Sequence, residues 1–274
     1  MPGDAAAPDL SFVVLTWNSA ATIAECLQSI VETCDREHLS REVFVVDNGS
    51  TDGTPAILRG FAATPGLTVV SLSQNGGTTR PRNLALARCA GEVVCLLDSD
   101  AALREGSVRG VVERLRAARG LGIVAPRLLL PDGDVQDSAR RFPSVPGKLG
   151  RAVGAVTRVR LAPPDLYPGF PFQSATPIDY AMSACWFFRR ALLDDIGYLD
   201  ERIFYSPEDV DFCLRCWQAG REVVWDPSVT VLHRATKLTH RKVISRIAVS
   251  HLCGLAYYFV KHRYWRRPDV GPGR

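Results

Sequence analysis

The chain has 274 residues, of which 46% are hydrophobic and 23% are charged. This length suits one large domain or two smaller ones that share a core, and the composition excludes a wholly disordered, collagenous or coiled-coil protein. The net charge of +4 is uneven, because residues 234–274 contain ten basic residues and one acidic residue and carry +9, against −5 for the preceding residues. A basic tail on an acidic body predicts an anionic partner for the tail.

The cysteine content and the first residues indicate the compartment. The eight cysteines have no spacing that is typical of a disulfide framework, and residues 1–9 lack the basic and apolar regions of a secretory leader. We therefore expect reduced thiols and a cytoplasmic protein. No apolar run reaches the ~18–20 residues that a membrane-spanning helix needs.

The first hundred residues alternate short β-branched runs with helical patterns. Strands are predicted at 11–16, 43–46, 67–72 and 93–97, with helical stretches between them. This alternation predicts a parallel sheet with helices on both faces. In such sheets ligands bind beyond the carboxyl ends of the strands. The polar residues at those ends are Thr16, Asn18, Asp47, Asp98 and Asp100.

The second half of the chain has a different pattern. It predicts a strand at 122–125, a hairpin turn at 131–133 and a long Pro-, Gly- and Arg-rich loop over 144–176. The predicted elements that follow are a strand at 178–188, a helix at 207–219, and short strands at 223–225 and 229–232. Apolar residues at helical spacing then predict a C-terminal helix.

Asp98 and Asp100 directly follow the fourth predicted strand. If the strand pleat continues, both carboxylates face one cation, and Mg²⁺ or Mn²⁺ takes oxygen ligands and commonly bridges phosphates. A solvated turn explains the pair equally well, because Asp is common after strands. The pair therefore predicts a metal site only in combination with other residues.

Three further features lie at the same predicted edge of the sheet. Asp47 can accept the ring N–H of uracil, thymine or guanine, or it can form a turn with the next two residues. The Gly-rich segment 75–77 allows close approach of a phosphate at a helix N-terminus, and a simple loop is an equal alternative. Arg80 and Arg82 can neutralise a diphosphate or lie solvated on the helix.

A second acidic cluster, Glu208, Asp209 and Asp211, opens the predicted helix at 207–219. Carboxylates stabilise a helix N-terminus, so capping alone can explain the cluster. The same position favours an ionised carboxylate, which suits a general base at neutral pH. His233 ends a short strand and is either a metal ligand or a structural imidazole, and by itself the structural interpretation is favoured.

Taken together and in order, these segments resemble the inverting family 2 glycosyltransferases, and most of all their rhamnosyltransferase-like branch. The matching segments are 13–30, 42–54, 75–86, 91–100, 122–144 and 181–233. Each motif is weak singly, whereas the ordered series is highly specific. The resemblance implies a GT-A fold, an α/β domain with a Rossmann-like, mostly parallel sheet, helices on both faces and a C-terminal helical extension.

The resemblance also implies an activity. The enzyme would be a hexosyltransferase that moves a sugar from a dTDP- or UDP-sugar to an acceptor hydroxyl in glycan, glycolipid or metabolite biosynthesis. Asp209 would be the general base, and Asp100, with Asp98 and His233, would bind Mn²⁺ or Mg²⁺. The implied donor-binding residues are Thr16, Asn18, Asp47, Gly77, Arg82, Asn83 and Asp98.

The implied organisation has three parts: a nucleotide-sugar-binding half over 1–120, an acceptor and catalytic-base half over 121–239, and a C-terminal extension over 240–274. Two positions depart from the rhamnosyltransferase-like pattern. Asp-Ser-Asp at 98–100 stands where that branch often has Asn-Pro-Asp, which is nearer the general family pattern. Gly stands within 75–77 where Leu is usual, and we expect this to alter the donor loop.

Two alternatives are open at this stage. A nucleotidyltransferase-like enzyme would need a Gly-rich, basic loop after the first strand, where Thr-Trp-Asn-Ser stands at 16–19 instead. A non-catalytic nucleotide-sugar-binding subunit would be indicated by loss of the acids at 100 and 209, which are both present. No nucleic acid is expected as a partner, because the basic tail has no nucleic-acid-binding motif.

Residues 241–267 predict an amphipathic helix in the plane of a membrane surface. The predicted stripe is Ile244, Ile247, Leu255, Tyr258 and Phe259, and the basic residues are Arg241, Lys242, Arg246, Lys261, Arg263, Arg266 and Arg267. Peripheral contact at the inner face of the membrane would bring the enzyme to a lipid-linked saccharide. The alternative is that the stripe packs on the catalytic domain, or on a second subunit in a homodimer.

Overall fold

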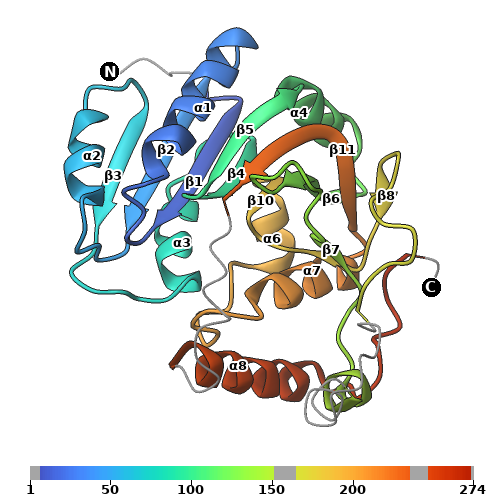
Figure 1. Cartoon of the computed structure of the whole chain (residues 1–274). Helices are drawn as coiled ribbons and strands as arrows, with labels where there is room; N and C mark the ends of the chain where they lie inside the picture. Colours follow the sequence, from blue (N-terminus) through green and yellow to red (C-terminus); the bar gives the residue numbers. More distant parts are fainter. Residues whose placement is uncertain (1–6, 151–164, 235–245, 273–274) are drawn as a thin grey trace.

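Four parallel strands form the first half of a nine-stranded sheet (Figure 1). The computed structural model describes residues 7–150, 165–234 and 246–272, without the side chains of 246–248. The four strands lie side by side in the order β3 (Leu67–Ser71), β2 (Arg41–Asp47), β1 (Leu10–Thr16) and β4 (Val93–Asp98). Thr16 is in register with Asp47, and Leu15 with Asp98, so the carboxyl ends of these strands align.

The second half of the sheet is mixed. Its strands are β10 (Cys185–Arg189), β6 (Leu121–Leu129), β11 (Glu222–His233) and β5 (Ala101–Gly106), and β8 (Thr176–Pro177) pairs with β11. A separate pair joins β7 (Ala139–Arg140) to β9 (Tyr180–Ala181). Because β5 runs antiparallel to β11, His233 lies opposite Ala101, next in the chain to Asp100.

Helices cover both faces of the sheet and divide the core into two clusters. On one face pack α1 (Ile23–Arg36), α2 (Thr54–Gly60) and α4 (Val108–Ala117). On the other pack α3 (Thr79–Leu86), α6 (Leu192–Ile196), α7 (Glu208–Gln218) and α8 (Arg246–His262). In α1 the helical spacing of Ile23, Leu27 and Ile30 places all three on the buried face. The predicted α/β class is confirmed.

The second half also departs from the predicted elements. The strand predicted at 178–188 is divided into β9 and β10, and the strands predicted at 223–225 and 229–232 join into β11 with an irregular register after Asp226. Strand β5 was not predicted, because its sequence, AALREG, contains no β-branched residue. Its pairing with β11, more than a hundred residues later, makes it a strand.

Helix α8 packs on the domain with part of the stripe that was predicted to face a membrane. Tyr258 is fully buried, and Leu255 and Phe259 pack against the same core cluster as α7. The membrane-facing prediction is therefore wrong for these three residues, because they complete the core on this side of the sheet. Arg241, Lys242 and Ile244 lie outside the described residues, as do the side chains of Arg246 and Ile247.

A different face of α8 is apolar and exposed. Val249, Leu252 and Val260 are 52%, 64% and 75% exposed, and Trp265, just after the helix, is 75% exposed. Their spacing along the helix places the three aliphatic residues on one stripe. Within the described ranges, no helix has both the length and the apolar character needed to cross a membrane.

Candidate active site

Three of the predicted donor-binding residues lie at or just beyond the carboxyl ends of β1 and β2. The Oγ1 atom of Thr16 is buried and, among the described residues, has no hydrogen-bond partner. The backbone N–H of Asn18 donates to Ser50 Oγ at 2.9 Å, and its Oδ1 accepts from the Thr51 N–H at 2.8 Å. Asp47 Oδ1 accepts from the Ser50 N–H at 3.0 Å. Asn18 thus joins the loop after β1 to the loop after β2, and Asp47 stabilises the turn of the second loop.

Asn48 is a buried site residue that the sequence did not single out. Its Nδ2 donates to the Gly77 carbonyl at 2.8 Å and to Asn75 Oδ1 at 3.1 Å, and its Oδ1 accepts from the Gly76 N–H at 2.8 Å. Asn48 therefore fixes the Gly-rich loop against the end of β2. The signal in the sequence was its position directly after Asp47, which is equally typical of a simple turn.

Asp98, Asp100 and His233 meet at the end of β4 and β11. One potential ligand atom from each lies within 4.8 Å of the others. His233 Nδ1 lies 2.6 Å from Gln136 Oε1, and its Nε2 lies 3.4 Å from Asp100 Oδ1. Burial lowers the pKa of His233, but the hydrogen bond and charge of Asp100 outweigh it and raise the pKa overall. Two carboxylates and an imidazole held in this way fit a divalent cation.

Arg82 of α3 joins this cluster to the acidic start of α7. Its side chain is 3% exposed and lies 2.5 Å from Asp98 Oδ1 and 3.4 Å from Glu208 Oε1. Ser183 accepts a hydrogen bond from the guanidinium at 3.1 Å and donates one to Glu208 at 3.0 Å. The sequence gave no sign of Ser183, because it lies about a hundred residues from Arg82 and only the fold brings the two together.

Glu208 is buried, its neighbour Asp209 is half-buried, and the two carboxyls have different surroundings. Burial, together with the charge of Asp209, raises the pKa of Glu208 to about 8. Burial raises the pKa of Asp209 to about 6, while its hydrogen bond from the Val210 N–H opposes the rise. The charge of Arg82 opposes the rise in the pKa of Glu208. The lower pKa of Asp209 makes it the more readily ionised member of the pair.

Asn83 and Gly77 connect α3 to the segment that precedes α7. Asn83 donates to the Leu199 carbonyl at 2.9 Å and accepts from the Leu199 N–H at 3.1 Å. Gly77 has φ +85°, and a Cβ atom there would lie 2.3 Å from the Phe204 carbonyl oxygen. Their predicted contacts with a donor stay predictions, whereas their contacts with residues 199–204 are part of the fold.

Residues 11–197 match the family model described as Glycosyl transferase family 2. The chain belongs to this family. It is a glycosyltransferase that uses a nucleotide-sugar donor, and the nucleotidyltransferase and non-catalytic alternatives are not supported.

Relatives place this family 2 glycosyltransferase in the rhamnosyltransferase-like branch. It is 28% identical over 280 residues to the N-acetylglucosaminyl-diphospho-decaprenol L-rhamnosyltransferase of Mycobacterium tuberculosis, covering 94% of this chain and 87% of that protein. It is 35% identical over 111 residues to succinoglycan biosynthesis protein ExoO of Rhizobium meliloti, covering 40% of this chain and 31% of that protein.

Solved structures share the GT-A fold with this chain. The structure of Staphylococcus aureus TarS 1–349 with UDP-GlcNAc has a TM-score of 0.56 at 22% identity, covering 86% of this chain and 62% of that chain. GalNAc-T7 with UDP, GalNAc and Mn²⁺ has a TM-score of 0.68 at 14% identity, covering 94% and 48%. The glycosyltransferase thus spans less than two thirds of either solved chain, and these likenesses confirm its fold.

Proposed function

We propose that this enzyme transfers a hexose, with inversion, from a dTDP- or UDP-sugar to a hydroxyl of a saccharide carried on a lipid diphosphate. The observation that carries the proposal is the arrangement around Arg82, which connects the Asp98–Asp100–His233 cluster to Glu208 and Asp209. One cluster suits the diphosphate of a donor, and the other suits the acceptor. The acceptor class is supported by the decaprenol-linked substrate in the name of the M. tuberculosis relative.

The donor would bind with its nucleoside beside Thr16, Asn18 and Asp47. There the buried Thr16 hydroxyl would gain the partner that it otherwise lacks within the described residues. The diphosphate would lie toward the Gly-rich loop and Arg82. Asp98, Asp100 and His233 would hold Mn²⁺ or Mg²⁺, and a bound divalent cation stabilises the negative charge of a departing diphosphate.

Asp209 would act as the general base. Its carboxylate takes the proton of the acceptor hydroxyl, and the hydroxyl oxygen forms a bond to the anomeric carbon. The bond from that carbon to the diphosphate oxygen breaks at the same time, and the electron pair leaves with the diphosphate. One displacement from the opposite face inverts the anomeric configuration. In this scheme residues 1–120 form the donor half and residues 121–239 the acceptor half.

We also propose that α8 and the residues after it touch an anionic membrane surface on the cytoplasmic side. The exposed stripe of Val249, Leu252 and Val260 lies next to exposed Trp265 and the basic residues Arg263 and Arg266. Apolar side chains with an aromatic residue and flanking cations suit a lipid interface, and each cation near an anionic surface contributes about 1 kcal/mol. A second copy of the chain in a homodimer is the competing occupant.

The test of the proposed function is a donor and acceptor panel. Purified enzyme with Mn²⁺ is given dTDP-rhamnose, UDP-GlcNAc or GDP-mannose, each with GlcNAc-diphospho-polyprenol in detergent or with free GlcNAc. We expect release of nucleoside diphosphate from a dTDP- or UDP-sugar, and only with the lipid-linked acceptor. Equal turnover with free GlcNAc would contradict the acceptor class, and turnover of GDP-mannose alone would contradict the donor class.

A further inference from the structure

We propose that α8 positions the catalytic base: Gly254, Lys261 and His262 hold the start of α7, where Glu208 and Asp209 lie. The inference rests on the proposed role of Asp209. The three α8 residues act through Asp211 and through the backbone at 206–207, so they are positioning residues. Their contacts bracket the Glu208–Asp209 pair on both sides along the chain.

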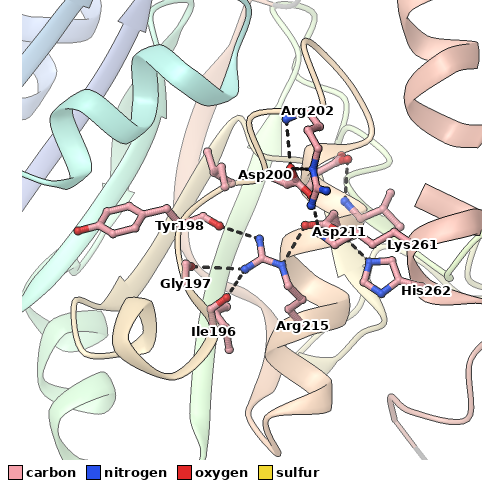
Figure 2. A network of polar contacts seen from close by, with 12 residues as sticks. Ile196, Gly197, Tyr198, Asp200, Arg202, Asp211, Arg215, Lys261 and His262 are labelled. Carbon is pink, nitrogen blue, oxygen red and sulfur yellow. Dashed lines mark hydrogen bonds and ion pairs between the residues drawn. The ribbon is translucent and has the colours of Figure 1, made fainter. Parts of the chain in front are cut away.

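The contact after the base is made by Asp211, whose side chain is 1% exposed (Figure 2). Asp211 Oδ1 accepts from His262 Nε2 at 2.8 Å and from Lys261 Nζ at 2.5 Å, and its Oδ2 accepts from Arg215 Nε at 2.9 Å. Burial raises the pKa of Asp211, but the His262 hydrogen bond and the charges of Arg215 and Lys261 lower it overall. A buried carboxylate is unfavourable without such partners, so Asp211 ties the first turn of α7 to the end of α8.

The contact before the base is made by Gly254. A Cβ atom at this position would lie 2.2 Å from the Ser206 carbonyl oxygen and 3.2 Å from Pro207 Cδ. Helix α8 therefore passes directly against the backbone that leads into Glu208. A glycine inside a helix lowers helix propensity, and here it permits the close approach of two backbones.

A third contact holds the segment that leads to α7. Asp200 accepts from Lys261 Nζ at 2.9 Å (Figure 2). It also accepts from the Tyr257 hydroxyl at 2.8 Å, and both donors belong to α8. On the opposite side the same segment is bound to α3, because the Thr78 N–H donates to the Phe204 carbonyl at 2.6 Å. Residues 200–207 thus contact both the start of α3 and α8. They lead directly into Glu208 and Asp209.

This arrangement predicts a selective kinetic defect when the contacts between α8 and the start of α7 are lost. A misplacement of a catalytic group by about 1 Å can lower a rate by 10²-fold. The proposed nucleoside-binding residues lie on β1 and β2, away from α8, so binding of the donor should not change. A loosened α7 start should therefore lower kcat and leave the donor KM unchanged.

The test uses full-length enzyme with His262→Leu, His262→Gln, Gly254→Ala and the control Arg221→Gln. Gln places an N–H donor near the position of Nε2, so it should restore the bond to Asp211 that Leu removes. Arg221 pairs with Asp195 at an exposed site, and its loss controls for removal of a charge. Three experiments are done. Steady-state kinetics with the active donor and acceptor from the panel give kcat and the donor KM. Calorimetry measures binding of UDP or dTDP with Mn²⁺, and hydrogen exchange is followed at the amides of 208–212.

We expect His262→Leu and Gly254→Ala to lower kcat by about 10²-fold, to keep the nucleotide Kd within twofold, and to speed exchange at 208–212. His262→Gln and Arg221→Gln should stay near wild type. A purely structural role would lower the number of nucleotide-binding sites and the total rate together, with kcat per site unchanged, and would overturn the inference. If no sugar is transferred at all, the proposed function fails, while unchanged exchange at 208–212 would by itself refute the positioning role.

Discussion

Arg82 shows how a single side chain connects two chemical centres. It is buried, and it contacts Asp98 at the proposed metal site and Glu208 beside the proposed base. Arginine suits this place because its planar guanidinium presents several donors in fixed directions and stays charged when buried. Its charge lowers the pKa of Asp98, Glu208 and Asp209, against the burial that raises all three. Arg82 therefore helps to decide which carboxyls are ionised.

The first prediction at the residue scale concerns Asp209. Asp209→Asn should lower kcat by about 10²–10⁴-fold, the usual contribution of a positioned base, with nucleotide binding intact. In the wild type, kcat should fall as the pH falls through about 6, because Asp209 becomes protonated below its pKa. The pH–rate profile and calorimetric binding of UDP or dTDP check both parts. An active Asp209→Asn enzyme beside an inactive Glu208→Gln enzyme would show that the two roles are reversed.

The second prediction concerns the Asp98–Asp100–His233 cluster. EDTA should abolish turnover, and added Mn²⁺ or Mg²⁺ should restore it, because two carboxylates and an imidazole suit such cations. Asp100→Asn should be folded and nearly inactive. The matched control is Glu105→Gln, which removes an exposed carboxylate from β5, the strand that follows Asp100, and should retain activity. Full turnover in EDTA would refute the metal assignment.

At the scale of elements, two residues just before α3 hold this helix against the segment that precedes α7. The Gly77 backbone has φ +85° and lies against Phe204, and the N–H of Thr78 donates to the Phe204 carbonyl. Only glycine combines this backbone conformation with so close an approach. Helix α3 and the segment that leads into α7 are therefore fixed to each other at this point.

The prediction at this scale compares two glycines. Gly77→Ala should lower the free energy of unfolding by more than the roughly 1–3 kcal/mol of a strained backbone conformation, because its Cβ would also collide with Phe204. Gly133 has a similar φ of +90°, but no atom lies within 4 Å of an added Cβ. The loss of unfolding free energy in Gly133→Ala therefore measures the backbone strain alone. Urea unfolding measures both. Equal losses would show that the Phe204 contact is not tight.

At the scale of the whole molecule, α8 has a buried face and an exposed apolar face. One face carries Tyr258 into the core and His262 onto Asp211, and the other presents Val249, Leu252 and Val260 to the outside. Because α8 is part of the core, point variants on its exposed face test membrane contact better than removal of the helix.

The corresponding prediction is that Leu252→Glu combined with Val260→Glu weakens binding to vesicles. Wild-type enzyme should sediment with anionic vesicles and much less with neutral ones at low salt, because both charge and apolar contact contribute. The double variant should stay in the supernatant with its solution activity unchanged. Leu84→Glu, at an exposed position of α3, is the control. Equal recovery of all proteins in the supernatant would refute membrane contact, and a concentration-dependent dimer lost in the double variant would favour the second copy.

The sequence by itself determined the parallel half of the sheet and the family, and it supplied the candidates for most residues of the proposed site. Buried parallel strands have local signals, namely β-branched runs that end in polar residues such as Asp47 and Asp98, and the family motifs are local strings. Tertiary structure alone decided three other features. These are the pairing that makes β5 a strand beside His233, the contacts of Arg82 with Ser183 and Glu208, and the face of α8 that is buried. The α8 sequence is apolar around most of its circumference, so periodicity could not choose between Tyr258 and Leu252. That choice was made by packing against segments distant in the chain, which a local pattern does not encode.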